Sequence, residues 1–133
     1  ILTIISSHSV ASTKNSYFND GKKLFDNKKY NESKFFFEKD IVFNPKSENS
    51  YLYLAKIFKV EENYNLEENN LNTVLLLNPI NEEAIYLLTL LNIKNSNFSE
   101  AKKLMISFNS VCKKICSSKL ELQSKLDSSL KSE

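Results

Sequence analysis

Apolar side chains recur at three- and four-residue steps between short polar stretches along most of the chain. This spacing places them on one face of a helix. The clearest stretches lie in residues 18–25, 36–43 and 52–58, and each predicted helix is about 13–15 residues long. A residue that precedes proline disfavours the α-helical conformation, so helices should end near Asn44 and Asn78. Asn31 and Ser99 are predicted as N-terminal caps. The pattern predicts a chain that is mostly helical and contains no sheet.

The polar stretches recur at a fixed interval. Pro45 and Pro79 lie 34 residues apart, and each follows an asparagine. At the same offset, residues 37–45 align with residues 71–79. The other aligned sets are Tyr17, Tyr51 and Ile85; Gly21, Ala55 and Thr89; Leu24 and Phe58; and Tyr30, Tyr64 and Phe98. So many matches at one offset indicate an internal repeat.

This repeat resembles the tetratricopeptide repeat (TPR), a helix–turn–helix unit of the same length. The resemblance places three repeats at residues 14–47, 48–81 and 82–112. It implies an all-α protein, an α-solenoid of antiparallel helix pairs with a TPR-like superhelical form. It also implies that Gly21 lies where the two helices of the first repeat cross closely, and that Tyr30 and Tyr64 are mostly buried at equivalent turns.

Two positions of the family pattern are matched unevenly. The family has a small residue early in its second helix, which Ser33 and Ala101 satisfy and Glu67 does not. The proline that closes a repeat is replaced by Lys113 in the third repeat.

The two ends differ from the repeats. Residues 1–13 begin with an apolar run and are expected to pack on or near the first repeat, or to occupy its groove. Residues 113–133 continue the helical pattern without a proline. They are expected to extend the last repeat helix or to form a separate capping helix, because a solenoid needs a terminal element with a polar outer face. A coiled-coil seam for a partner is the alternative for this end.

Composition and charge exclude several classes of protein. The 133 residues suffice for one domain, and the single glycine argues against sandwich and dinucleotide-binding folds. The net charge is only +2 and all 18 basic residues are lysine, so we expect no nucleic-acid partner. No stretch is apolar for long enough to span a membrane. A chain rich in Lys and Asn and free of Arg is typical of an AT-rich genome, and a bacterium is the expected source.

The sequence offers little chemistry. One glycine cannot form a phosphate-binding loop, and His8, the only histidine, has no cysteine placed beside it as a nucleophile. Cys112 and Cys116 are interpreted as small apolar residues on one helix face, where a local disulfide has poor geometry; redox sensing or metal binding is the alternative. We therefore expect no catalysis, no cofactor and no metal.

In TPR proteins the first helices of successive repeats line a concave groove that holds a peptide or a partner helix. The resemblance therefore implies a partner-binding groove in this chain, made of aromatic, aliphatic and lysine side chains. Its predicted members are Asn15, Phe18, Lys22, Phe25, Asn49, Leu52, Lys56, Lys59, Tyr86, Leu90 and Ile93. One TPR subfamily clamps a terminal carboxylate with basic and amide side chains, but at those positions only Lys22 is basic here, so that specificity is not expected.

The sequence thus predicts a non-catalytic module that binds another protein or peptide. The alternatives are a self-associating structural module, in which a homodimer forms, and a regulatory fragment of a larger enzyme. The apolar start of the chain favours a bacterial cell envelope or periplasmic location, with a role in envelope assembly or partner stabilisation; the cytoplasm is the alternative.

Overall fold

The structure, a computed structural model, describes residues 16–132. Within this range the chain forms seven α-helices and no strand, which confirms the prediction of a helical chain without a sheet. The helices are α1 (Ser16–Asp26), α2 (Tyr30–Phe43), α3 (Glu48–Val60), α4 (Tyr64–Leu77), α5 (Glu82–Lys94), α6 (Phe98–Val111) and α7 (Lys119–Lys131). A short 3-10 turn, η1 (Cys116–Ser118), precedes α7.

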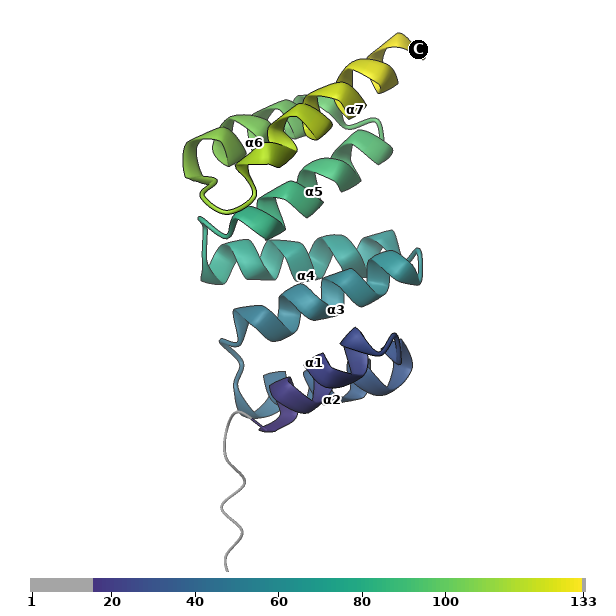
Figure 1. Cartoon of the computed structure of the whole chain (residues 1–133), viewed down its shortest axis with the longest axis vertical. Coiled ribbons are helices and arrows are strands. Elements are labelled where there is room, and N and C mark those ends of the chain that lie inside the picture. The colour runs from purple at the N-terminus through teal and green to yellow at the C-terminus, as the bar shows by residue number, and fades with distance from the viewer. Residues whose placement is uncertain (1–15, 133) are drawn as a thin grey trace, which may run out of the picture.

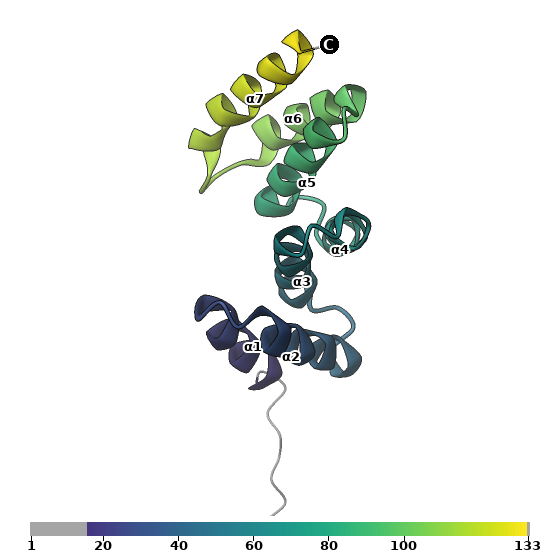
Figure 2. The same cartoon turned by 90° about the vertical axis from the view of Figure 1, so that its right-hand side faces the viewer.

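The helices form antiparallel pairs that stack along the long axis of the molecule (Figure 1). The largest contacts lie within the pairs α1–α2, α3–α4 and α5–α6. Successive pairs are joined by contacts of α2 with α3 and of α4 with α5, and α7 packs on both α5 and α6. Figure 2 shows α3 and α7 toward one side of the stack and α4 toward the other. This arrangement is an α-solenoid, as predicted.

The helix boundaries follow the offset of 34 residues. Helices α2, α4 and α6 begin at Tyr30, Tyr64 and Phe98. Helices α2 and α4 end before the capping residues Asn44 and Asn78, whose φ values of −134° and −142° are extended, as expected before proline. The predicted ends of these helices are confirmed.

The turn inside each pair has one recurring conformation. Lys28, Glu62 and Ser96 have positive φ values of 59°, 56° and 57°. After each of them, a backbone N–H reaches back to a carbonyl at the end of the preceding helix, which is the Schellman arrangement usually built on glycine. These bonds join Lys29 to Leu24, Asn63 to Phe58 and Asn97 to Asn92, at 2.9, 2.9 and 2.8 Å.

The predicted caps at Asn31 and Ser99 are wrong. Each of these helices begins two residues after the residue with positive φ, Lys28 or Ser96. Helix α2 therefore begins at Tyr30 after Lys29, and α6 begins at Phe98 after Asn97. Neither of these two capping residues makes a side-chain cap hydrogen bond. The turn geometry therefore sets these helix starts, and the preference of the side chains does not.

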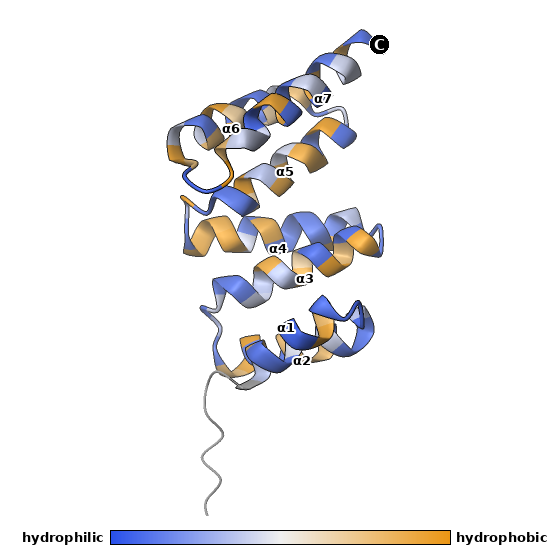
Figure 3. Ribbon diagram, in the orientation of Figure 1, coloured by the Kyte–Doolittle hydropathy of each residue, from blue (hydrophilic) through white to orange (hydrophobic). Residues whose placement is uncertain are grey.

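Each helix carries both apolar and polar residues (Figure 3), and most of the buried side chains are apolar. Phe37, Leu54, Ile57 and Phe58 form a buried cluster between the first pair and α3. A larger cluster extends from α3 to α7 and includes Leu71, Phe108 and Leu122. The core of the described residues therefore consists of two clusters along the stack, and α3 contributes to both.

The close crossing predicted at Gly21 is present. A Cβ atom added there would lie 2.8 Å from Cε1 of the buried Phe37, so only glycine fits without a shift. The Ser33 hydroxyl of α2 donates a hydrogen bond to the Gly21 carbonyl at 2.7 Å. Ala55 and Thr89, the aligned residues, are also fully buried. Tyr30 and Tyr64 lie in equivalent turns, and both are covered for the most part by packing against the core, which agrees with the expectation.

The segment between α6 and α7 does not have the helical structure predicted around Cys112 and Cys116. Helix α6 ends at Val111, and Cys112 has an extended backbone. Residues 112–116 therefore leave the helix, which brings the Cα atoms of Cys112 and Cys116 to 5.2 Å and allows a disulfide between them. The interpretation of these residues as unpaired helical cysteines is wrong, because it assumed that the helix continues. Helix α7 is separate from α6, which agrees with the alternative of a separate helix at this end and not with an extended repeat helix.

Candidate partner-binding surface

Helices α1, α3, α5 and α7 together form one surface, which we call the odd-helix face. Its first part is aromatic. The Tyr53 ring on α3 lies 5.6 Å from the Phe18 ring and 5.0 Å from the Phe25 ring, both in edge-to-face contact. All three side chains are half-buried and pack on the first core cluster. They therefore contribute both to stability and to the accessible surface.

Lysines border this aromatic group. Lys56 on α3 pairs with Glu83 on α5 at 2.6 Å and lies 4.5 Å from the centre of the Tyr53 ring. Lys22 on α1 pairs with Asp26 at 2.7 Å, one turn along the same helix. Lys56 thus joins two helix pairs across the face, whereas Lys22 is neutralised locally.

Three predicted groove residues are less accessible than the prediction assumed. Leu52 and Ile93 are only 5% and 6% exposed, because their side chains pack into the core between the helix pairs. Tyr86 is half-buried, and its hydroxyl donates to Glu121 Oε2 of α7 at 3.0 Å, so α7 already engages it. Burial and this hydrogen bond both raise the pKa of Tyr86. Asn15 lies outside the described residues.

The remaining predicted residues are accessible. Asn49 is exposed beside Phe18, and both line a small cavity of about 240 Å³. Lys59 is exposed and Leu90 is half-buried, and both line a larger cavity.

This larger cavity, which we call the α3–α7 cavity, was not anticipated from the sequence. Its volume is about 490 Å³, within the range of small-molecule and side-chain pockets. Its walls come from the ends of α3 and α5, the start of α4 and the middle of α7. The apolar members are Leu90, Leu91 and Ile93, whereas Ser124 and Ser128 of α7 contribute hydroxyls.

One buried carboxylate lines the same cavity. Glu67 of α4 is only 3% exposed and occupies the position where the aligned residues are the small Ser33 and Ala101. Burial raises the pKa of the Glu67 carboxyl, and the positive charges of Lys59 and Lys94 lower it in part. Within residues 16–132 this carboxylate has no ion pair or hydrogen bond. The sequence signal was its departure from the repeat pattern, but the cavity beside it could not be inferred.

Lysines and a tyrosine surround the mouth of the cavity. Lys94 of α5 contacts the Tyr64 hydroxyl and lies 4.0 Å from the centre of the Tyr64 ring. Lys125 of α7 pairs loosely with Glu121 at 3.9 Å. With Lys59, three ammonium groups line the cavity, together with the exposed carboxylate of Glu62 and the buried carboxylate of Glu67.

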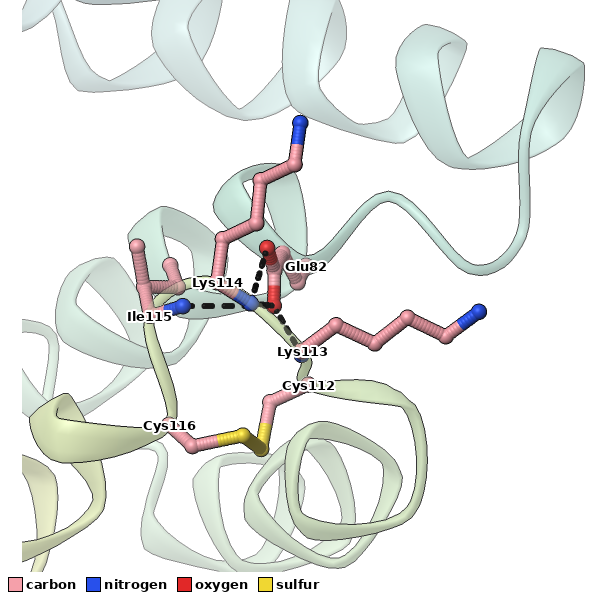
Figure 4. Close-up of a disulfide and its surroundings, with 6 residues drawn as sticks. All are labelled: Glu82, Cys112, Lys113, Lys114, Ile115 and Cys116. Carbon is pink, nitrogen blue, oxygen red and sulfur yellow. Dashed lines mark hydrogen bonds between the residues drawn. A yellow bond between two sulfur atoms is a disulfide. The ribbon is translucent and has the colours of Figure 1, made fainter.

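The loop before α7 is fixed by a second carboxylate, that of Glu82 at the start of α5. Glu82 accepts hydrogen bonds from the backbone N–H groups of Lys113 at 2.5 Å, Lys114 at 3.0 Å and Ile115 at 3.5 Å (Figure 4). These bonds, that from Lys113 above all, lower the pKa of the Glu82 carboxyl. The Cys112–Cys116 disulfide closes the same loop. Together they hold the loop so that α7 can cover α5 and α6.

Other kinds of site find no support in residues 16–132. They contain no cluster of histidine, cysteine, aspartate and glutamate that could hold a metal ion. None of the helices described is both long enough and apolar enough to cross a membrane.

Helix pairs stacked at a 34-residue interval, with small residues at their crossings, define a TPR-like α-solenoid. Among solved structures, the chain is similar to the C-terminal TPR-containing domain of a Plasmodium falciparum protein described as an FK506-binding protein. The TM-score is 0.72 at 16% sequence identity, and the match covers 90% of this chain and 87% of that domain. No protein-family model matches the sequence. No curated protein matches it either. The likeness confirms the TPR-like fold.

Proposed function

We propose that this chain is a non-catalytic module that binds a segment of a partner protein on the odd-helix face. The α3–α7 cavity carries the proposal, because side chains of α3, α5 and α7 line it and it combines apolar walls with charged groups. The aromatic side chains of α1 and α3 extend this surface along the solenoid. Such mixed surfaces supply contact area at their centre and electrostatic steering at their rim.

Affinity capture tests this proposal. The full chain is used to capture a partner from the lysate of its source organism, and binding is then compared for Lys59→Glu and Lys102→Glu. Lys59 lines the cavity, whereas Lys102 is exposed on α6. Both variants change the charge equally. We expect Lys59→Glu to weaken binding about tenfold, mainly through slower association, and Lys102→Glu to leave it unchanged. Equal binding by both variants and the parent would show that this face is not the interface.

The choice of Lys59 follows from the structure. Phe18 and Tyr86 are larger groove candidates, but Phe18 packs on the Phe37 and Tyr53 rings and Tyr86 bonds to α7. Truncating either of them would disturb the fold together with the surface. Lys59 has neither kind of contact within the described part of the chain, so its substitution reports on binding.

A role in the bacterial envelope is the more specific part of the proposal. The Cys112–Cys116 disulfide supports an oxidising compartment such as the periplasm, since cytosolic thiols are kept reduced. Alkylation of the native protein before and after reduction distinguishes an envelope location from a cytoplasmic one. Cysteines that react only after reduction agree with the envelope, and cysteines that react at once point to the cytoplasm.

Self-association is a second candidate, favoured by an apolar strip on the outer side of the first pair. Phe35 and Val42 of α2 are 57% and 73% exposed and lie two turns apart on one helix face. Light scattering on the full chain measures this directly: a dimer that Val42→Lys converts to a monomer would support it. A monomeric parent chain would exclude it.

A further inference from the structure

Glu67 of α4 is the most unusual side chain of the α3–α7 cavity. A buried charge that lacks a partner is costly, and proteins normally pair it, neutralise it or replace it. Lys59 and Lys94 are close enough to lower the Glu67 pKa, yet neither ammonium lies within ion-pair distance of the carboxylate. No fully enclosed side-chain nitrogen or oxygen within residues 16–132 lacks a hydrogen-bond partner, so the unbonded Glu67 oxygens are not fully enclosed and line the α3–α7 cavity.

The walls of this cavity suit an aliphatic chain that ends in a charge. Leu90 and Leu91 of α5 give it an apolar side, and Glu67 gives it an acidic group set among the helices. A lysine or arginine side chain has this composition, because its methylene stem packs on apolar surface and its cation forms charge-assisted hydrogen bonds. Glu67 would then gain the partner that it lacks.

The mouth of the cavity places a second requirement on the ligand. Lys59, Lys94 and Lys125 line it with a single exposed carboxylate, that of Glu62, so its net positive charge would repel a segment with several basic residues. Acidic residues on either side of a single basic one would face these lysines instead. An acidic side chain inserted into the cavity would meet the Glu67 carboxylate and be disfavoured.

We propose that the α3–α7 cavity binds the side chain of one lysine or arginine from an extended partner segment, with Glu67 as its counter-ion and with flanking acidic residues facing Lys59, Lys94 and Lys125. The inference rests on the proposed function, since it specifies the partner of the same face. It adds a residue that the repeat pattern does not provide, because the aligned Ser33 and Ala101 carry no charge.

Peptide selection tests the inference without a known partner. A phage library of short random peptides is selected against the full chain, and the enriched peptides are synthesised. We expect them to share one basic residue flanked by acidic ones. Each peptide is also made with norleucine in place of lysine, or citrulline in place of arginine, which keeps the stem and removes the charge. This change leaves the protein untouched, so it does not depend on a variant that folds.

The peptide pairs are then measured on the parent, on Glu67→Gln and on Glu68→Gln. Glu68 neighbours Glu67 on α4 but does not line the cavity, so it is a matched control. Removing the peptide charge should lower affinity about tenfold for the parent and for Glu68→Gln. For Glu67→Gln the loss should be less than about twofold, because the pairing charge is absent on the protein side as well.

The outcomes separate the inference from the function on which it rests. Suppose that the enriched peptides bind Lys59→Glu more weakly than the parent. The inference is overturned, and the proposed function stands, if these peptides lack a basic residue. The same holds if removing the peptide charge lowers their affinity for Glu67→Gln as much as for the parent. No enriched peptide, or peptides indifferent to Lys59→Glu, would overturn both.

Discussion

At the scale of single residues, Glu67 links stability to binding. Its carboxylate is buried where the aligned repeats have serine and alanine, and this burial penalises its charged form. A group that lowers stability while it improves a binding site is common at functional surfaces.

The pH dependence of stability measures this cost. Burial raises the pKa of Glu67 in the folded chain above its unfolded value, so the folded state holds this proton more tightly. The contribution of Glu67 to stability is therefore largest below the unfolded pKa and falls as pH rises through the folded pKa. We expect Glu67→Gln to melt at a higher temperature than the parent at neutral pH, and the two to converge in acid. A parent that melts higher at neutral pH would show that the carboxylate is paired inside the fold.

Gly21 sets the closest approach of two helices. Gly21→Leu would force side-chain atoms against the Phe37 ring, which is fully buried and packs on Phe18 and Tyr53. We expect a loss of about 1–3 kcal/mol in the free energy of unfolding, measured by denaturant titration. Lys23→Leu, at an exposed position of the same helix, controls for helix propensity and should stay within about 0.5 kcal/mol. Equal stability of the two variants would place the helix crossing elsewhere.

At the scale of elements, the periodic pattern predicts most of the helices and their offset. The stops at Asn44 and Asn78 follow from a local steric rule, so the sequence alone is sufficient for them. The starts of α2 and α6 were missed, because the left-handed residues that set them are Lys28 and Ser96 and not glycines. The disulfide was missed because the end of α6 at Val111 has no proline or glycine to mark it. The α3–α7 cavity joins residues from four helices, and no local pattern shows how their side chains meet.

The attachment of α7 depends on Glu82. Since three backbone N–H groups favour its charged form, the pKa of Glu82 lies below its unfolded value. Its stabilising effect is therefore present above the unfolded pKa and is lost as pH falls through the folded pKa. We expect Glu82→Gln to lower the melting temperature at neutral pH and to match the parent in strong acid.

Glu48→Gln is the control for this prediction. Glu48 lies in the first turn of α3, 34 residues before Glu82, and has the same position relative to its helix N-terminus. It accepts no loop hydrogen bond among the residues described, so the difference between the two variants isolates the contacts with residues 113–115. An equal effect of both variants would mean that the helix dipole alone is responsible.

At the scale of the whole molecule, the stack of helix pairs places residues that are distant in sequence on one surface. Lys56 and Glu83 join α3 to α5, and Tyr86 and Glu121 join α5 to α7. Because each pair contacts mainly its neighbours, these contacts fix the relative position of the helices that form the odd-helix face. Residues 1–13, expected to pack on or near the first repeat or to occupy the groove, lie outside the described residues.

Hydrogen–deuterium exchange of the full chain with and without its captured partner tests the central claim most directly. If the odd-helix face binds the partner, amides of α3, α5 and α7 around Lys59, Leu90 and Ser128 should exchange more slowly in the complex, and those of α2 and α6 should not change. Protection confined to α2 or α6 would contradict the account and place the interface on the opposite side of the solenoid.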